Sequence, residues 1–150
     1  MNYWLMKTEP ETYSIDDLKK NKTSIWEGVR NFQARNNMRA MKKGDMVLFY
    51  HSSTKPPGVA GIAKIIKEAY PDPFQFKKDS PYYDPKSTLK KPRWSTVEVE
   101  FVKKFKNYVT LEELKNKPEL TEMVVIKVGR LSVQPVTKLE FDIVVGMGDE

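Results

Sequence analysis

The stretch WEGVRNFQARNNMRAMKKGDMVLFYHS, residues 26–52, contains the pattern from which the architecture of the chain follows. Apolar residues recur there at the helical spacing i, i+4, i+7, which predicts a helix from about Asn31. These residues are Ala34, Met38 and Met41. Gly44 ends this helix, and residues 46–51 follow as a strand. Because both alternating sets of side chains in that strand are apolar, we expect it to be buried on two faces.

Further strands and short helices are predicted on both sides of this stretch. Strands are expected at residues 3–7, 59–70 and 94–103, and the second of these is expected to pair antiparallel with residues 45–51. Gly61 in the second strand marks a place where another backbone approaches closely. Capping boxes predict the starts of three short helices. They begin at Ser14, Thr110 and Thr137. Residues 119–127 fit either a helix or a buried strand.

Locally paired strands interrupted by short helices indicate an α+β fold. We expect a small bent β-sheet or open β-barrel with short helices packed around it. The long helices of alternating βαβ units are missing from the pattern, so a doubly wound nucleotide-binding sheet is not expected. With 150 residues and neither a linker nor an internal repeat, the chain is expected to form a single domain, residues 1–150.

The amino-acid composition limits which kinds of binding site and which cellular locations are expected. There are no cysteines, so disulfides and thiolate metal sites are excluded and a cytoplasmic location is expected. The single histidine does not favour a transition-metal site, and we expect neither a metal nor a cofactor. No stretch has the pattern of a signal peptide or the length of a membrane span. We therefore expect no membrane partner, and we expect a monomer.

The charge distribution mildly favours a polyanionic partner. The chain carries 26 basic and 20 acidic residues, a net charge of +6, and the basic excess lies in the first 100 residues. Such an excess is compatible with nucleic acid binding. Many small domains are as basic and bind nothing acidic, so charge alone does not decide the partner.

A proline-rich segment, residues 70–93, separates two predicted strands. It holds several aromatic residues, among them Tyr82 and Tyr83. A loop of this length inside a small domain is either functional or disordered. Its aromatic content favours order, because disordered segments are poor in aromatic residues.

The sequence offers little for catalysis. It contains no nucleophile elbow, P-loop or dinucleotide fingerprint. His51 and Ser52 are neighbours at the end of a strand, where successive side chains point to opposite faces. A structural role of His51 is therefore favoured over that of a general base, and we do not expect an enzyme.

The residues are better suited to binding a flat heterocyclic ring. Trp26 lies in a loop beside Val29, Arg30 and Asn31, and Trp94 follows a basic segment. Aromatic faces stack on bases at roughly 1–3 kcal/mol each. The arginines that could contact phosphates, which position a ligand without reading its sequence, are Arg30, Arg35 and Arg39. The alternative for Trp26 is ordinary packing in the core.

Residues 26–52 resemble the signature of the EVE domain, a member of the PUA-like superfamily that includes the YTH readers of methylated RNA bases. The resemblance covers nearly the whole chain. It extends to Lys7-Thr-Glu-Pro10 with Tyr13-Ser14 and Asp17-Leu18, to Gly61-Ile-Ala63 and Glu68–Asp72, and to Arg130–Val133 followed by Pro135.

The resemblance implies a PUA-like barrel whose pocket accepts a flipped, modified base. Trp26 and Trp94 would form its aromatic walls. The base edge would be read by Asn31 and Ser52, with Ser132 and the backbone around Val29 closing the pocket. Lys7, Arg30 and Arg130 would contact the phosphodiester. Possible neighbours of the pocket are Ser14, His51 and Leu131.

The resulting hypothesis is a non-catalytic reader that binds nucleic acid carrying a modified base, taken as a modified cytosine in DNA. Three alternatives stay open. The first is a PUA-like RNA-binding accessory domain that recognises a modified RNA base. The second is a small enzyme that acts on a nucleoside or amide with His51 or Glu9 as the base. The third is a protein-interaction module that uses the Tyr82–Tyr83 loop.

Overall fold

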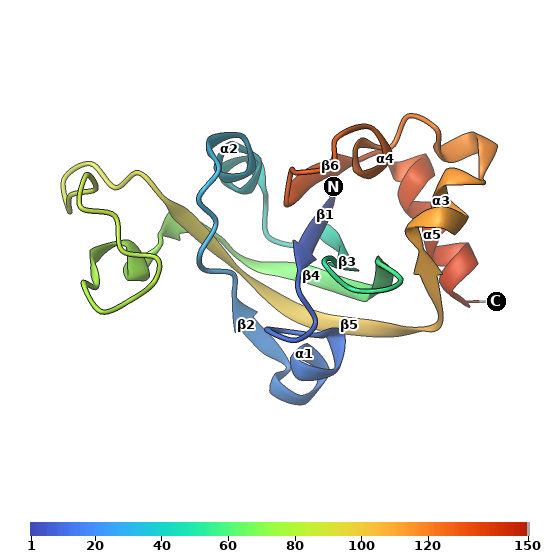
Figure 1. Ribbon diagram of the computed structural model, residues 1–150, viewed down its shortest axis with the longest axis horizontal. Coiled ribbons are helices and arrows are strands. Elements are labelled where there is room, and N and C mark those ends of the chain that lie inside the picture. Colours follow the sequence, from blue (N-terminus) through green and yellow to red (C-terminus); the bar gives the residue numbers. More distant parts are fainter. Residues whose placement is uncertain (150) are drawn as a thin grey trace.

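A six-stranded mixed sheet forms the centre of the computed structural model, which describes residues 1–149 (Figure 1). Its strands are β1 (Tyr3–Thr8), β2 (Thr23–Ile25), β3 (Met46–His51), β4 (Gly58–Pro71), β5 (Ser95–Thr110) and β6 (Val133–Val136). Their spatial order is β2–β5–β4–β3–β1–β6. Neighbouring strands pair antiparallel except β1 and β3, which are parallel. Since β2 and β6 remain as edges, the sheet is open.

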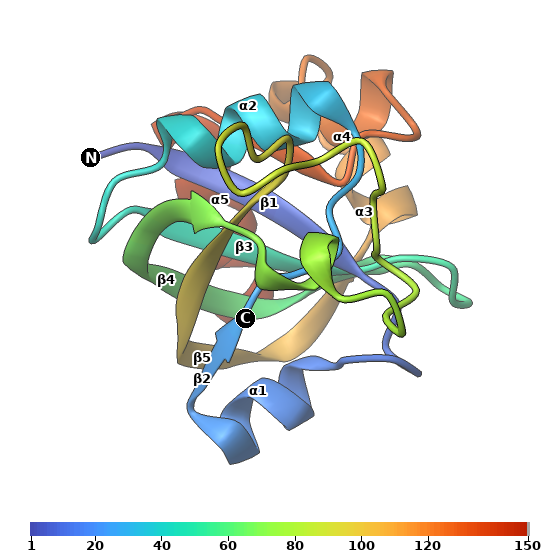
Figure 2. The ribbon, with the colours of Figure 1, turned by 90° about the vertical axis from the view of Figure 1, so that its left-hand side faces the viewer.

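The sheet is strongly bent along its two longest strands, β4 and β5 (Figure 2). Their pairing shifts register at four points, and such irregularities increase the local twist and bend a strand. A Cβ atom at Gly61 would collide with the carbonyl oxygen of Lys103. The close backbone approach predicted at Gly61 is therefore confirmed, as is the expected α+β class with a small, bent, open sheet.

The central strand β3 is buried on both faces, as its sequence predicted. The parallel pairing with β1 places Leu5 beside Leu48 and Met6 beside Phe49. Leu5 and Leu48 belong to one hydrophobic cluster, and Met6 and Phe49 belong to a second. Because adjacent strand residues point to opposite faces, the two clusters form the two sides of the core.

Short helices surround the sheet. They are α1 (Ile15–Asn21), α2 (Phe32–Ala40), α3 (Leu111–Lys115), α4 (Val124–Lys127) and α5 (Lys138–Asp149), with 3-10 turns η1 (Pro73–Phe76) and η2 (Pro118–Leu120). All three predicted capping boxes are present, at Ser14, Thr110 and Thr137. In the described part of the chain, every helix is too short or too polar to cross a bilayer.

The elements differ from the predictions at three places. The short edge strand β2 was not predicted, because three residues carry no readable periodicity. The strand expected at residues 94–103 begins at Ser95 and continues to Thr110. The ambiguous residues 119–127 contain the end of η2 and the short helix α4, so the buried strand considered there does not form.

The segment between β4 and β5, which contains η1, is folded against the sheet by buried polar contacts. The side-chain nitrogen of Gln75 donates to the carbonyl oxygens of Asp72 (2.7 Å) and Trp94 (2.8 Å). The backbone N–H of Trp94 donates to the side-chain oxygen of Gln75 (3.0 Å). Gln75 is fully buried, so this amide joins the two ends of the segment and gives it a defined conformation.

Candidate nucleic-acid interface

A cleft of about 740 Å³ opens where the ends of β1 and β3 meet the loop before α2. This volume is within the range of small-molecule sites, roughly 300–1,000 Å³. The lining includes predicted site residues from four separate segments, together with Tyr82 from a fifth. Among the lining residues are Lys7, Glu9, Trp26, Val29, Arg30, Ser52, Tyr82, Arg130 and Ser132.

Strand pairing brings two predicted hydroxyl groups to this cleft. The backbone N–H of Lys7 donates to the carbonyl oxygen of Ser132 (2.8 Å), and that of Ser52 donates to the carbonyl oxygen of Thr8 (2.9 Å). Both serines therefore flank the end of β1. Within residues 1–149, neither serine hydroxyl has a hydrogen-bond partner, so both are available to a ligand.

Two cations lie at the same cleft. The Lys7 ammonium donates to the carbonyl oxygen of Gly129 (3.1 Å) and lies 5.5 Å from the ring centre of Tyr50. Burial lowers the pKa of Lys7, because desolvation disfavours its charged form. Arg130 is exposed, and its guanidinium makes no ion pair with any residue in the described range.

Trp26 has two roles in the structure. Its indole packs edge-to-face on Phe49, with the ring centres 5.6 Å apart, and only 8% of the residue is exposed. It also lines the cleft. Trp26 therefore packs in the core with most of its surface and also contributes to the lining of the cleft.

The loop after Trp26 is shaped by Gly28 and Asp72. Gly28 has φ +85°, a backbone conformation that glycine adopts without steric penalty. Its N–H donates to the Asp72 carboxylate (2.9 Å). A Cβ atom at Gly28 would come within 2.6 Å of the Tyr82 ring. The absence of a side chain at this position thus lets Tyr82 pack against the loop beside the cleft.

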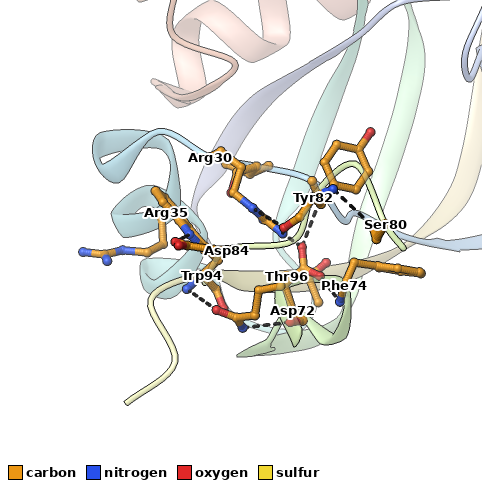
Figure 3. A network of polar contacts seen from close by, with 12 residues as sticks. Arg30, Arg35, Asp72, Phe74, Ser80, Tyr82, Asp84, Trp94 and Thr96 are labelled. Atoms are coloured by element: carbon orange, nitrogen blue, oxygen red, sulfur yellow. Dashed lines mark hydrogen bonds and ion pairs between the residues drawn. The ribbon is translucent and has the colours of Figure 1, made fainter. Parts of the chain in front are cut away.

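Arg30 lines the cleft, but its guanidinium is largely engaged by the protein (Figure 3). It donates to the carbonyl oxygens of Tyr82 and Val29 and forms an ion pair of 3.1 Å with Asp72. These contacts use four of the five N–H groups of an arginine. Arg30 therefore fastens the segment around Tyr82 to the loop before α2, and its contact with a phosphate stays a prediction.

Trp94 and Asn31 do not line the cleft, contrary to expectation. The indole N–H of Trp94 donates to Asp84 (2.7 Å), and its ring stacks on Phe32. The side-chain oxygen of Asn31 accepts the N–H of Ala34 (2.9 Å) as the N-cap of α2. An asparagine in this position satisfies a helix end, so its oxygen is engaged by the protein, and the reading of a base edge by Asn31 stays a prediction.

The other predicted residues also lie outside the cleft lining. Ser14 caps α1, with its hydroxyl accepting the N–H of Asp17 (3.2 Å). Leu131 is buried in the core. Arg35 and Arg39 lie on α2. The Arg35 guanidinium donates to the carbonyl oxygen of Arg93, and the Arg39 guanidinium donates to the hydroxyl of Ser95 at the start of β5.

His51 has a structural role at the start of α1. Its Nε2 atom accepts the backbone N–H of Ile15 (3.1 Å). Burial lowers the pKa of His51, while Asp16 raises it and Lys104 lowers it. The neutral ring is therefore favoured, and its acceptor nitrogen is occupied. Within residues 1–149 no group of three histidine, aspartate or glutamate residues could hold a metal ion.

Several cleft residues were not assigned to the base pocket, and among them Tyr82 is an aromatic residue from a distant segment. The sequence contained a signal for it, since Tyr82 lies in a proline-rich segment whose aromatic content indicated order. Its place beside Gly28 depends on the contact of that segment with the loop before α2, and no periodicity encodes such a contact.

Comparison with known proteins places the chain among close relatives. The model of the EVE domain family matches residues 2–147. Human thymocyte nuclear protein 1 is 46% identical over 168 residues, which span 99% of this chain and 75% of that protein. The mouse protein of the same name is 47% identical over 97% of this chain and 73% of its own length.

Solved structures show the same fold. A hypothetical protein from Leishmania major has a TM-score of 0.95 at 52% identity, over 99% of this chain and 94% of that one. The human thymocyte nuclear protein 1, solved in complex with DNA that contains 5-methylcytosine, has a TM-score of 0.95 at 46% identity, over 100% and 99% of the two chains. An ASCH protein from Zymomonas mobilis, at 9% identity and a TM-score of 0.57, shares the fold alone.

Proposed function

The chain belongs to the EVE domain family, and we propose on this basis that it is a non-catalytic reader of nucleic acid, whose cleft binds a modified cytosine of DNA. The observation that carries the proposal is the cleft whose lining contains both Trp26 and two serines, Ser52 and Ser132, with hydroxyls that have no partner within residues 1–149. This combination offers a ring for stacking and polar atoms for a base edge.

The energetics are compatible with an extruded base. Removing a base from a duplex costs a few kcal/mol. Stacking on an aromatic side chain contributes roughly 1–3 kcal/mol, and the cleft has Trp26 and Tyr82 in its lining. A methyl group that fills an apolar corner adds on the order of 1 kcal/mol. In this scheme Tyr82 takes the place that was expected for Trp94.

Two further points support nucleic acid as the partner. Lys7 and Arg130 place positive charge beside the cleft, where phosphate groups flanking the bound base would lie. The human relative solved with 5-methylcytosine DNA is similar over the full length of this chain. The enzyme alternative has less support for His51 as its base, because the acceptor nitrogen of His51 is used by Ile15.

The test is the binding of duplex oligonucleotides that differ only in one central cytosine, methylated or unmethylated. We expect the wild type to prefer the methylated duplex. Trp26→Leu removes the ring from the cleft, and it should lower affinity for the methylated duplex by roughly 5- to 150-fold, the equivalent of 1–3 kcal/mol of stacking. Salt-sensitive binding to the backbone should remain.

Trp4→Leu is the matched control, because Trp4 is also a buried indole, with 6% exposure, and does not line this cleft. It should lower stability without changing the preference for the methylated base. Equal preference in wild type and Trp26→Leu would contradict the proposal, and so would a wild type without any preference. A matched RNA competitor that binds more tightly than the DNA would favour the RNA-binding alternative instead.

A further inference from the structure

A second surface with the chemistry of a nucleic-acid contact lies beside the cleft, at the start of α2. Its base is a pair of stacked rings, Phe32 and Trp94, whose centres are 4.8 Å apart at an angle of 20°. Phe32 is 48% exposed. An exposed phenylalanine on a polar helix is not required by packing, since the hydrophobic face of α2 is formed by the buried residues Ala34 and Met38.

Two arginines, Arg35 and Arg93, lie over this ring pair, and a third, Arg39, lies beside them. The guanidinium carbon of Arg35 lies 4.8 Å from the centre of the Phe32 ring, and that of Arg93 lies 5.4 Å from the same centre. The Nε atom of Arg39 donates to the hydroxyl of Ser95 (2.9 Å). Figure 3 shows Arg35 directed away from the contacts between Arg30 and Asp72.

The positive charge of this surface is only partly neutralised. Arg93 forms an ion pair with Asp84 (3.2 Å). In the described part of the chain, neither Arg35 nor Arg39 forms an ion pair with a carboxylate. Burial lowers the pKa of Arg35, and the charges of Arg39 and Arg93 lower it further. The three cations therefore repel one another, and an anion placed between them would relieve this repulsion.

The rings prepare the guanidinium groups for binding. A cation held over an aromatic face is stabilised by about 0.5–1 kcal/mol at an exposed site. It has also lost part of its rotamer freedom before a ligand arrives, which lowers the entropy cost of association. Arginine binds phosphate oxygens through two parallel N–H groups, so the geometry and the charge both suit a phosphodiester.

The surface is continuous with the cleft. Arg30 lines the cleft, and its guanidinium carbon lies 5.5 Å from the centre of the Trp94 ring. Trp94 in turn stacks on Phe32. One strand of nucleic acid can therefore extend from the cleft over this surface, whereas an isolated acidic group would use only one of the two.

We propose that Arg35 and Arg93, held on the Phe32–Trp94 ring pair, together with Arg39 beside them, bind the phosphodiester backbone of the strand whose modified base occupies the cleft. The proposal rests on the proposed function for the identity of the strand. The surface contributes affinity that is independent of base identity, because phosphate contacts carry no sequence information.

The test compares the double variant R35Q/R39Q with the wild type on methylated and unmethylated duplexes over a series of salt concentrations. Each phosphate contact contributes about 0.9 to the slope of log affinity against log salt concentration. We therefore expect the slope to fall in magnitude by about 1.8. Affinity should fall by the same factor on both duplexes, and the ratio between them should stay unchanged.

The control double variant K106Q/K115Q removes the same net charge elsewhere. Lys106 and Lys115 are exposed, and α3 and the end of β5 lie on the side of the molecule away from the 72–94 segment (Figure 1). The control should leave the slope close to that of the wild type. A second variant, Phe32→Leu, keeps every charge but removes the ring under Arg35, and it should weaken binding to both duplexes several-fold.

Two results would overturn the proposal. One is an unchanged salt slope in R35Q/R39Q, with folding verified by thermal unfolding. The other is an equal change of slope in K106Q/K115Q, which would mean that overall charge rather than this surface attracts the strand. Failure of the proposed function would give a different result. The wild type would then bind the methylated and unmethylated duplexes equally, regardless of how affinity depends on salt concentration.

Discussion

Replacing Asp72 by asparagine should loosen the contact between the proline-rich segment and the loop that borders the cleft. The Asp72 carboxylate is fully buried. One oxygen accepts the N–H of Gly28 (2.9 Å) and pairs with Arg30 (3.1 Å), and the other accepts the N–H of Phe74 (2.8 Å). Asparagine has almost the same size, so the substitution changes the charge and one acceptor while it leaves the packing intact.

The expected loss is about 2–3 kcal/mol of unfolding free energy. Removing one partner of a buried ion pair destabilises a protein by roughly 3–5 kcal/mol. The Arg30 side chain is 22% exposed, so water can solvate it in part and the loss is smaller. The amide oxygen can still accept from Phe74, whereas the amide nitrogen would face the donors of Gly28 and Arg30. At roughly 2–4 °C for each kcal/mol, the melting temperature should fall by about 4–12 °C.

Urea unfolding followed by tryptophan fluorescence measures this loss, and an unchanged m-value would show that the comparison is valid. Asp84→Asn is the matched control. Asp84 lies in the same segment and accepts from Trp94 and Arg93, but it does not touch the loop before α2. We expect a smaller loss there, together with an unaltered base preference. A loss below about 1 kcal/mol in Asp72→Asn, or equal losses in both variants, would refute the assigned role of Asp72, since a buried unpaired donor alone costs about that much.

Two other perturbations follow from the loop and from the strand end. Gly28→Ala should destabilise more than Gly44→Ala: both positions have positive φ, which costs about 1–2 kcal/mol for alanine, but only at Gly28 would the added Cβ meet the Tyr82 ring. Equal unfolding free energies of the two variants would contradict this. His51 has a pKa lowered by burial from its ordinary value of 6.5, so its stabilising effect is complete above pH 6.5 and is lost as the pH falls through the lowered value. Unfolding free energies measured against pH should decline more steeply below pH 6.5 in the wild type than in His51→Gln, which keeps an acceptor without titrating there; parallel curves would exclude the role of His51.

Local patterns correctly predicted most of the elements. The capping boxes that start helices at Ser14, Thr110 and Thr137 are present, because capping involves residues only three positions apart. The helix and the strand within residues 26–52 also form where their periodicities place them. Such signals are readable since both partners of each contact lie in one short segment.

Asn31 shows that the local sequence alone does not decide the role of a candidate site residue. An asparagine before a helix can cap it or bind a ligand, and the two roles require the same residue type. The structure shows its oxygen on the N–H of Ala34. Trp94 is a similar case: an indole after a basic segment can stack on a ligand or on the protein, and here it stacks on Phe32.

The sequence by itself determined the α+β class and the resemblance to the EVE domain, because the periodicities, caps and motifs behind them each lie within a short stretch of the chain. Only the tertiary structure decided which polar groups remain free for a ligand. Asp72 holds Gly28 across 44 positions, and Arg30 holds Tyr82 across 52. A hydrogen bond to a distant partner takes up a donor or acceptor that a base or a phosphate could otherwise use, and no local pattern records whether that partner is present.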